Sequence, residues 1–192
     1  ESQCHWSSFT PSAYGAGSRD LGAQVFFHPH VHSMYSHLDG MVPVVDLVKQ
    51  AHRYGHQALA LTDHGVMSGV FQLYTECKKR DMLPFPGVEL YVVDNVEDKD
   101  SPRYHMTAFA FTTDGYKALV ALVTQSHMRD HFHHKPRIDM TDIIGWAEMF
   151  PSGVAGIAFT TGCFFGPLIQ KCEDVDEGAR LVKNLAVHLP NL

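Results

Sequence analysis

Short runs of apolar residues alternate along the chain with longer stretches in which apolar side chains recur every three or four positions. The short runs are typical of buried strands, and the longer stretches are typical of amphipathic helices. The pattern predicts strands at Val25–Phe27, Ala58–Leu61, Val88–Val93, Met106–Phe111 and Val154–Phe159. It predicts helices at Val44–Tyr54, Val66–Arg80, Tyr116–Met128, Thr141 to about Phe150, and Asp176–His188. Thr141 is the expected N-cap of the fourth helix.

The alternation of strands and helices predicts an α/β fold built from βα units around a parallel sheet. About five strands are indicated, enough for an open sheet or for most of a βα barrel. A closed eight-stranded barrel takes ~250 residues, so a chain of 192 residues would stop short of closure. Residues 1–22 are rich in Ser and Gly without a hydrophobic period, so we expect a flexible N-terminal extension followed by one domain over residues 23–192.

Composition places the chain among globular proteins, because hydrophobic residues make up 45% of it and charged residues 19%. The net charge is −6, from 15 Lys and Arg against 21 Asp and Glu. This balance excludes a general electrostatic attraction to nucleic acid. Any contact with phosphate groups must therefore be local or use metal ions.

The four cysteines are far apart and form no CxxC pair, so neither a disulfide framework nor a zinc ribbon is indicated. No apolar run approaches the ~20 residues of a membrane span. Residues 1–22 lack the basic and apolar regions of a signal peptide. We therefore expect a soluble, cytoplasmic protein without a membrane partner.

Histidine is unusually frequent, with 14 residues, almost as many as Lys and Arg combined. Several histidines lie beside the predicted strands, together with carboxylates and a thiol. Because strand ends and their loops form a common face in a parallel βα fold, we expect these side chains to converge. Imidazole, carboxylate and thiolate are ligand types for zinc, manganese or iron. The candidate metal ligands are His30, His32, Asp39, His64, Glu89, His105 and Cys163.

Spacing supports a shared ion for the first pair, because His30 and His32 stand two residues apart on extended backbone and so point to the same side. Glu89 can bridge two ions, since a carboxylate has two oxygens. Asp63, beside His64, is expected to orient ligands rather than to bind an ion directly. Each signal alone also fits a turn, a structural histidine or a core residue. Their common position beside strands favours the metal site.

The remaining histidines lack this placement. Those between His127 and His134 lie across a helix end and a loop, so we expect them on a solvated surface. Cys77 lies on the apolar face of its predicted helix and is expected in the core.

Six stretches carry a specific combination of motifs. They are His28–Gly40 (HPHVHSMYSHLDG), Ala58–Gly65 (ALALTDHG), Gly87–Val92 (GVELYV), Tyr104–Ala110 (YHMTAFA), Lys135–Asp139 (KPRID) and Thr161–Gly166 (TGCFFG). The combination resembles the PHP (polymerase and histidinol phosphatase) domain, in the form found at the N-terminus of bacterial DNA polymerase III alpha subunits. The resemblance covers residues 25 to 170 approximately.

The resemblance implies a distorted seven-stranded, TIM-like βα barrel that holds two to three divalent metal ions, zinc or manganese. By the family pattern, His30, His32 and Glu89 would hold the first ion. Glu89 would bridge to the second, which His105 and Cys163 complete, and Asp39 with His64 would hold the third. The family adds a later Asp-x-His element that residues 164–192 do not contain. We therefore expect an incomplete barrel from a longer polypeptide.

The activity implied is that of a metal-dependent phosphoesterase, a 3′–5′ exonuclease that proofreads for a DNA polymerase during replication. Its substrate would be the 3′ end of a DNA primer. Asp63 and Arg137 are the candidate catalytic residues, and Lys135 and Arg137 are candidate phosphate contacts. A surface turn around Pro136 explains the same basic residues equally well.

Two other functions remain open. The domain could be a catalytically silent structural module that stabilises the polymerase and docks a separate exonuclease subunit. It could also be a stand-alone phosphatase of small phosphate monoesters. For the proofreading exonuclease and for the structural module, the partners would be polymerase domains of the same chain and, beyond them, a sliding clamp or a separate exonuclease.

Overall fold

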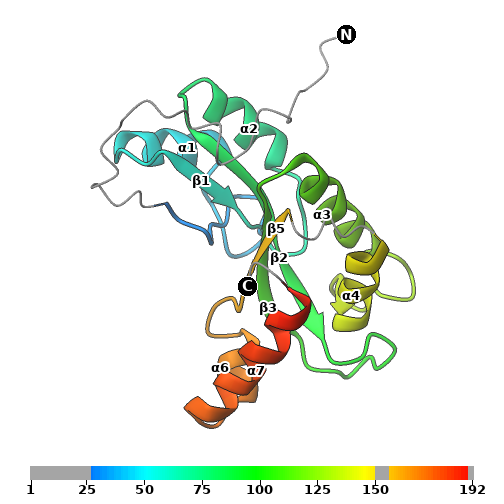
Figure 1. The fold of residues 1–192 in the computed structure, drawn as a ribbon. Helices are drawn as coiled ribbons and strands as arrows, with labels where there is room; N and C mark the ends of the chain where they lie inside the picture. Colours follow the sequence, from blue (N-terminus) through cyan, green and yellow to red (C-terminus); the bar gives the residue numbers. More distant parts are fainter. Residues whose placement is uncertain (1–26, 150–155, 190–192) are drawn as a thin grey trace.

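The computed structural model describes residues 27–149 and 156–189, in which helices pack around a β-sheet (Figure 1). The strands are β1 (Ala58–Leu61), β2 (Leu83–Val93), β3 (Tyr104–Ala110), β4 (Arg137–Asp139) and β5 (Ile157–Thr160). The helices are α1 (Val44–Arg53), α2 (Val70–Lys78), α3 (Thr113–Ser126), α4 (Met140–Met149), α6 (Pro167–Lys171) and α7 (Val175–His188). The expected extension at residues 1–22 lies outside the described residues.

The long strand β2 is the centre of the sheet, whose order is β1-β2-β3-β5 with β4 also paired to β2. β1 pairs in parallel with the first part of β2, at Leu83–Pro86. β3 pairs antiparallel along Gly87–Val92, and β4 pairs in parallel at Tyr91–Val93. Because Tyr91 and Val92 pair with both β3 and β4, these two strands lie on opposite edges of β2.

The prediction of a parallel sheet is wrong for β3. This strand runs antiparallel to both of its neighbours, β2 and β5. The connection between β2 and β3, residues 94–103, contains no helix. A parallel neighbour needs a crossover of about a dozen residues or more, usually through a helix, whereas an antiparallel neighbour needs only a turn.

The described residues form one five-stranded sheet, and the seven-stranded barrel is not seen in them. Val25 and Phe26 of the first predicted strand lie outside the described residues, and Phe27 is not in a strand. The segment that follows runs beside β1, where Ala60 N donates to His28 O at 3.3 Å. β4 was not predicted, because three residues are too few to show a period.

β2 begins at Leu83, before the predicted start at Val88, and its added residues include two prolines. Leu83 N donates to Gln57 O at 2.8 Å, so the N–H of residue 83 faces β1. Since successive N–H groups point to opposite edges of a strand, the positions of Pro84 and Pro86 face the other edge. β3 pairs with β2 only from Gly87 onward, so the missing proline donors cost the sheet no hydrogen bond.

Most helices begin and end close to their predicted limits. Thr112 caps α3 by accepting a hydrogen bond from Gly115 N at 3.0 Å. The predicted cap of α4, Thr141, is wrong. Asp139 accepts from Asp142 N at 3.0 Å while Asp142 accepts from Asp139 N at 3.1 Å, a reciprocal capping box two residues earlier. The short helix α6 was not predicted.

Two apolar clusters hold the sheet in place. One lies between β1, α1 and α2, and contains the fully buried Cys77, which confirms its expected core position. The other lies between β2, β3, β5 and the helices α3, α4 and α7. The second cluster contains Val88, Leu90 and Val92 of β2, and the first holds its neighbour β1. Among residues 27–149 and 156–189, no helix is long and apolar enough to cross a membrane.

Candidate metal centre

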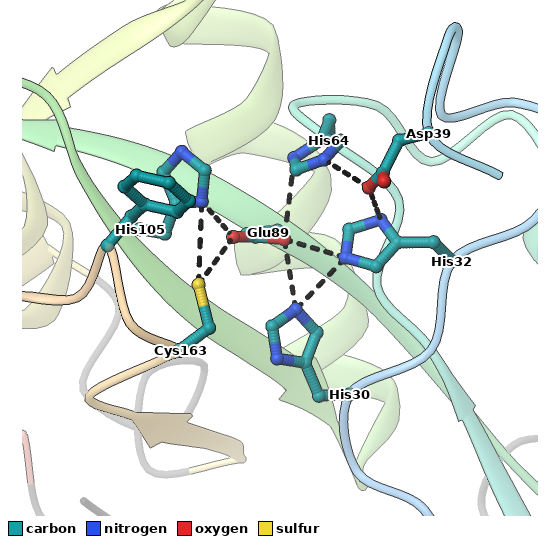
Figure 2. A pocket seen from close by; sticks show the side chains of 8 residues that line it. His30, His32, Asp39, His64, Glu89, His105 and Cys163 are labelled. Carbon is teal, nitrogen blue, oxygen red and sulfur yellow. Dashed lines mark hydrogen bonds and ion pairs between the residues drawn. The ribbon is translucent and has the colours of Figure 1, made fainter.

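One cavity of about 390 Å³ collects every residue predicted as a metal ligand (Figure 2). The segment before α1 contributes three of them, the loop after β1 one, β2 and β3 one each, and the loop after β5 the last. An eighth lining residue, Phe165, was not predicted. The cavity is lined by His30, His32, Asp39, His64, Glu89, His105, Cys163 and Phe165.

Glu89 is the centre of the cluster, and its side chain is only 1% exposed. Its Oε2 atom lies 2.9 Å from His30 Nε2 and 2.8 Å from His32 Nε2. Its Oε1 atom contacts His105 Nδ1 and lies 3.9 Å from Cys163 Sγ. Figure 2 shows the two carboxylate oxygens directed toward these two different sets of side chains. This is the arrangement that a bridging carboxylate requires.

Three sets of side chains bring their donor atoms within 4.8 Å of one another. The first is His30, His32 and Glu89, as the family pattern implied. In the second, His64 joins Glu89 and His105, and the Cys163 Sγ expected there lies 3.8 Å from His105 Nδ1. The third adds His32 to the expected pair of Asp39 and His64, whose Oδ2 and Nε2 atoms are 2.8 Å apart.

Burial and hydrogen bonds shift the pKa values of the clustered side chains in opposite directions. Burial raises the pKa of Glu89, but hydrogen bonds from His105, His30 and His32 outweigh it and hold that pKa well below its usual range. Burial lowers the pKa of His32, yet its hydrogen bond to Glu89 and nearby carboxylates raise it on balance. Burial lowers the pKa of His64, and this effect prevails. The site therefore holds an ionised carboxylate beside a neutral imidazole.

Asp63 lies behind the cavity and does not line it. Its Oδ1 atom accepts hydrogen bonds from Ser33 N at 2.6 Å and from the Ser36 hydroxyl at 2.7 Å, and its Oδ2 atom accepts from the Ser33 hydroxyl at 2.7 Å. Both oxygens are thus occupied by the loop that carries His30 and His32. This location corrects the prediction of a catalytic role for Asp63 and fits the orienting role expected from its neighbours in sequence.

Ser36 was not singled out in the sequence, although it is fully buried beside the cluster. Its hydroxyl lies 2.8 Å from His32 Nδ1 and accepts from His64 N at 3.1 Å. One hydroxyl thus contacts Asp63 and two candidate ligands. A serine four residues after a candidate ligand was the available signal, but serine is so common in turns that this spacing carries little weight alone.

Arg137 is only 2% exposed, which corrects its prediction as a catalytic residue and phosphate contact. Its guanidinium donates to the carbonyl oxygens of Val96, Asp98 and His131. These bonds tie the loop after β2 to the loop before β4. His131 is buried as well, so the expected solvated surface is wrong at that position.

Lys135 is exposed, with its Nζ 5.5 Å from the ring centre of Tyr91. The Tyr91 ring stacks on His64 with centroids 5.9 Å apart and meets the edge of His105 at 5.1 Å. Lys135 is therefore one ring away from the cluster. Its predicted phosphate contact agrees with this location and stays a prediction.

The family model of the PHP domain matches residues 28–189, most of the chain. The chain belongs to the PHP domain family. Among curated proteins, this PHP domain is similar to DNA polymerase III subunit alpha of Borreliella burgdorferi, with 33% identity over 147 residues, 73% of this chain and 12% of the relative. The same subunit of Treponema pallidum is 34% identical over 149 residues, 74% of this chain and 12% of the relative.

The PHP domain thus spans about one eighth of the length of these relatives. Among solved structures, it is similar to a protein of Bifidobacterium adolescentis that carries the provisional description of a metal-dependent phosphoesterase. That similarity has a TM-score of 0.39 and 22% identity, and covers 52% of this chain and 32% of the other.

Proposed function

We propose that this PHP domain binds two to three divalent metal ions and acts as a metal-dependent phosphoesterase, a 3′–5′ exonuclease that proofreads during DNA replication. The observation that carries the proposal is the buried Glu89 carboxylate with its two oxygens turned to different donor sets. His30, His32 and Glu89 would hold one ion. Glu89, His105 and Cys163 would hold another, and Asp39 with His64 a third.

The chemistry of His64 fits a cation in this cavity. Its Nε2 lies 2.8 Å from Asp39 Oδ2 and donates to that carboxylate. The lowered pKa keeps the ring neutral, so Nδ1 carries a lone pair. Nδ1 is buried, has no hydrogen-bond partner among the described residues, and lies 3.4 Å from Glu89 Oε2. A buried acceptor without a donor, next to a carboxylate oxygen, is unfavourable, and a cation bound by His64 Nδ1 and Glu89 relieves this.

Zinc or manganese are the candidate ions, and the donor set favours zinc because imidazole and thiolate are its preferred ligands. Bound divalent ions supply a water of lowered pKa and a Lewis acid that neutralises charge on phosphate oxygens. The chain's own part is to hold the ligands in place and to exclude bulk water from Glu89. Lys135, beside Tyr91 at the edge of the site, would contact a phosphate oxygen.

The substrate under this proposal is the 3′ end of a DNA primer. The acidic net charge of −6 does not oppose it, because the contact with phosphate is local. The relatives are DNA polymerase III alpha subunits of which this chain spans 12%. We propose that polymerase domains of such a polypeptide, with a sliding clamp, bring DNA to the cavity.

Metal analysis and a labelled-primer assay on the same preparations test the proposal. A polypeptide in which this domain is followed by the family's Asp-x-His element, loaded with zinc or manganese, should release nucleotides from the 3′ end. Glu89→Gln keeps the side-chain size but removes the charge, and should lose bound metal and activity together. Glu97→Gln changes an exposed carboxylate outside the cavity and is the matched control. Equal metal content and activity in Glu89→Gln and Glu97→Gln would overturn the proposal.

Two other results would replace the exonuclease with the alternative functions. Tightly bound metal without hydrolysis of any phosphoester would assign a structural role and a separate exonuclease as partner. Hydrolysis of p-nitrophenyl phosphate without release of nucleotides from DNA would assign a phosphatase of small monoesters.

A further inference from the structure

An aromatic side chain, Phe165, stands at the edge of a cavity that is otherwise lined by polar groups. It is 56% exposed, and its neighbour Phe164 is 68% exposed. The Phe165 ring lies 5.5 Å from the ring of His105, with Phe164 packed edge-on against it at 5.6 Å. A large apolar surface beside a site for charged ligands is typical of ligand recognition.

The backbone around Phe165 holds the ring at this place. His105 N donates to Phe165 O at 3.0 Å, and Gly166 N donates to Cys163 O at 2.8 Å. Gly162 turns the chain with φ +77°, so close to β3 that a Cβ would lie 2.1 Å from His105 O. The exposure of Phe165 therefore belongs to a turn that is tied to the same strand as a candidate ligand.

Phe165 ends a row of side chains along the candidate metal centre. The His105 ring contacts both the Phe165 ring at 5.5 Å and the Tyr91 ring at 5.1 Å. The Lys135 ammonium lies over Tyr91, 5.5 Å from its ring centre. The row thus runs from an exposed aromatic ring, past an imidazole next to Glu89, to an exposed cation. A nucleotide presents the same sequence of features, a flat base followed by a charged phosphate.

We propose that Phe165 stacks against the base of the terminal nucleotide while its phosphate lies at the metal centre. The proposal rests on the phosphoesterase function and names its substrate class, single-stranded nucleic acid ends. A base can lie on a protein ring only after leaving its own stack, so an unpaired end is bound in preference to a paired one. Stacking tolerates every base, because each has a π-face.

Fluorescence of 2-aminopurine placed at the 3′ end of a single-stranded oligonucleotide measures the stacking directly. A phosphorothioate at the last linkage prevents hydrolysis, so binding is read independently of catalysis. The zinc-loaded chain should quench the fluorescence. Phe165→Ala should remove the quenching and weaken binding roughly 5- to 150-fold, the range for loss of one base–aromatic stack. Phe165→Tyr, which keeps the ring, should retain both.

Phe71→Ala is the matched control, because Phe71 is 74% exposed on α2 and does not line the cavity. An oligonucleotide with an abasic 3′ end completes the comparison: it should bind to Phe165→Ala as tightly as the base-bearing oligonucleotide does, whereas the original chain should distinguish the two. Equal losses for both oligonucleotides would overturn the proposal and assign Phe165 to the support of the loop. Unchanged quenching in Phe165→Ala would also overturn it.

The test separates this proposal from the phosphoesterase function. Quenching that depends on Phe165, in a chain that hydrolyses no phosphoester, would support the stacking proposal and reject the phosphoesterase function. If the chain hydrolyses DNA ends but quenches no better than Phe165→Ala, the phosphoesterase function is supported and the stacking proposal is rejected.

Discussion

The Ser36 hydroxyl lies 2.7 Å from Asp63 Oδ1 and donates its only hydrogen to that carboxylate. Because the hydrogen is committed, Ser36 Oγ must accept in its contact with His32 Nδ1 at 2.8 Å. His32 therefore carries a proton on Nδ1, and only its Nε2 is available to an ion. Nε2 is the nitrogen that faces His30 and Glu89. The relation between Ser36 and Asp63 thus selects the tautomer of a candidate ligand.

We predict that Ser36→Ala weakens metal binding about 10- to 100-fold, the usual effect of losing a group that orients a ligand. The substitution also leaves buried polar groups of His32 and Asp63 short of a partner, which costs about 1–3 kcal/mol of unfolding free energy. Competition with a chromogenic zinc chelator and urea unfolding measure the two effects. Ser68→Ala, at an exposed serine, is the control. Equal zinc affinity in both variants would contradict the selection of the His32 tautomer.

The sequence predicted which residues gather around Glu89 better than it predicted the sheet. Glu89 could be identified because a carboxylate inside a buried apolar strand needs a partner, and its neighbours in the cavity also stand at strand ends. Arg137 could not be placed, because the Lys-Pro-Arg composition is typical of a surface turn. The carbonyl oxygens that bury it belong to residues 96 and 98, far away in sequence. Such long-range contacts leave no periodic signal.

Phe165 and Tyr91 are two further residues whose position could not be predicted from the sequence. Neither residue was singled out in the sequence, since aromatic residues in or near strands usually pack inside. Tyr91 is buried, but it lies between His64 and Lys135. Phe165 remains exposed, because the turn at Gly162 carries it to the edge of the cavity. Which side of a turn a residue faces depends on the tertiary fold.

The thiols provide a second test of the ligand assignment. Burial raises the pKa of Cys77 to about 12, so this thiol should not react with N-ethylmaleimide in the folded chain. Cys163 and Cys172 are partly exposed and should react. Zinc should slow the reaction of Cys163 at least tenfold, because a metal-bound thiolate is no longer free, and should leave Cys172 unchanged. Peptide mass spectrometry reads each thiol separately. Equal rates for Cys163 with and without zinc would remove it from the proposed ligands.

We predict that Glu89 makes the metal-free chain sensitive to acid. Its folded-state pKa lies below the usual ~4.3 of an unfolded glutamate. Its contribution to stability is therefore present above that value and is lost as the pH falls toward the folded pKa. His32 acts in the opposite direction: its raised pKa gives stability that is present below ~6.5 and is lost as the pH rises.

Urea unfolding in EDTA between pH 3 and pH 8 measures this dependence. Glu89→Gln cannot ionise, so its free energy of unfolding should fall less steeply below about pH 4.3 than that of the original chain. It should also flatten the decline above about pH 6.5, because the hydrogen bond that raises the pKa of His32 is weakened. Glu97→Gln should follow the original chain. Parallel profiles for Glu89→Gln and Glu97→Gln would show that Glu89 and His32 are not coupled.

Two glycine substitutions test whether the turn before Cys163 is required by the site. Gly162 has φ +77°, and a Cβ there would lie 2.1 Å from the carbonyl oxygen of His105. Alanine at this position must move the backbone, at a cost of about 1–3 kcal/mol. Because the same turn carries Cys163 and contacts His105, we expect Gly162→Ala to weaken zinc binding as well.

Gly145 lies inside α4, where a Cβ would meet nothing within 4 Å. Gly145→Ala should therefore raise the free energy of unfolding by about 0.5–1 kcal/mol and leave zinc binding unchanged. Thermal unfolding and zinc titration of both variants measure these effects. If Gly162→Ala were as stable as Gly145→Ala and bound zinc with the same affinity, the turn would not be what holds Cys163 and His105 together.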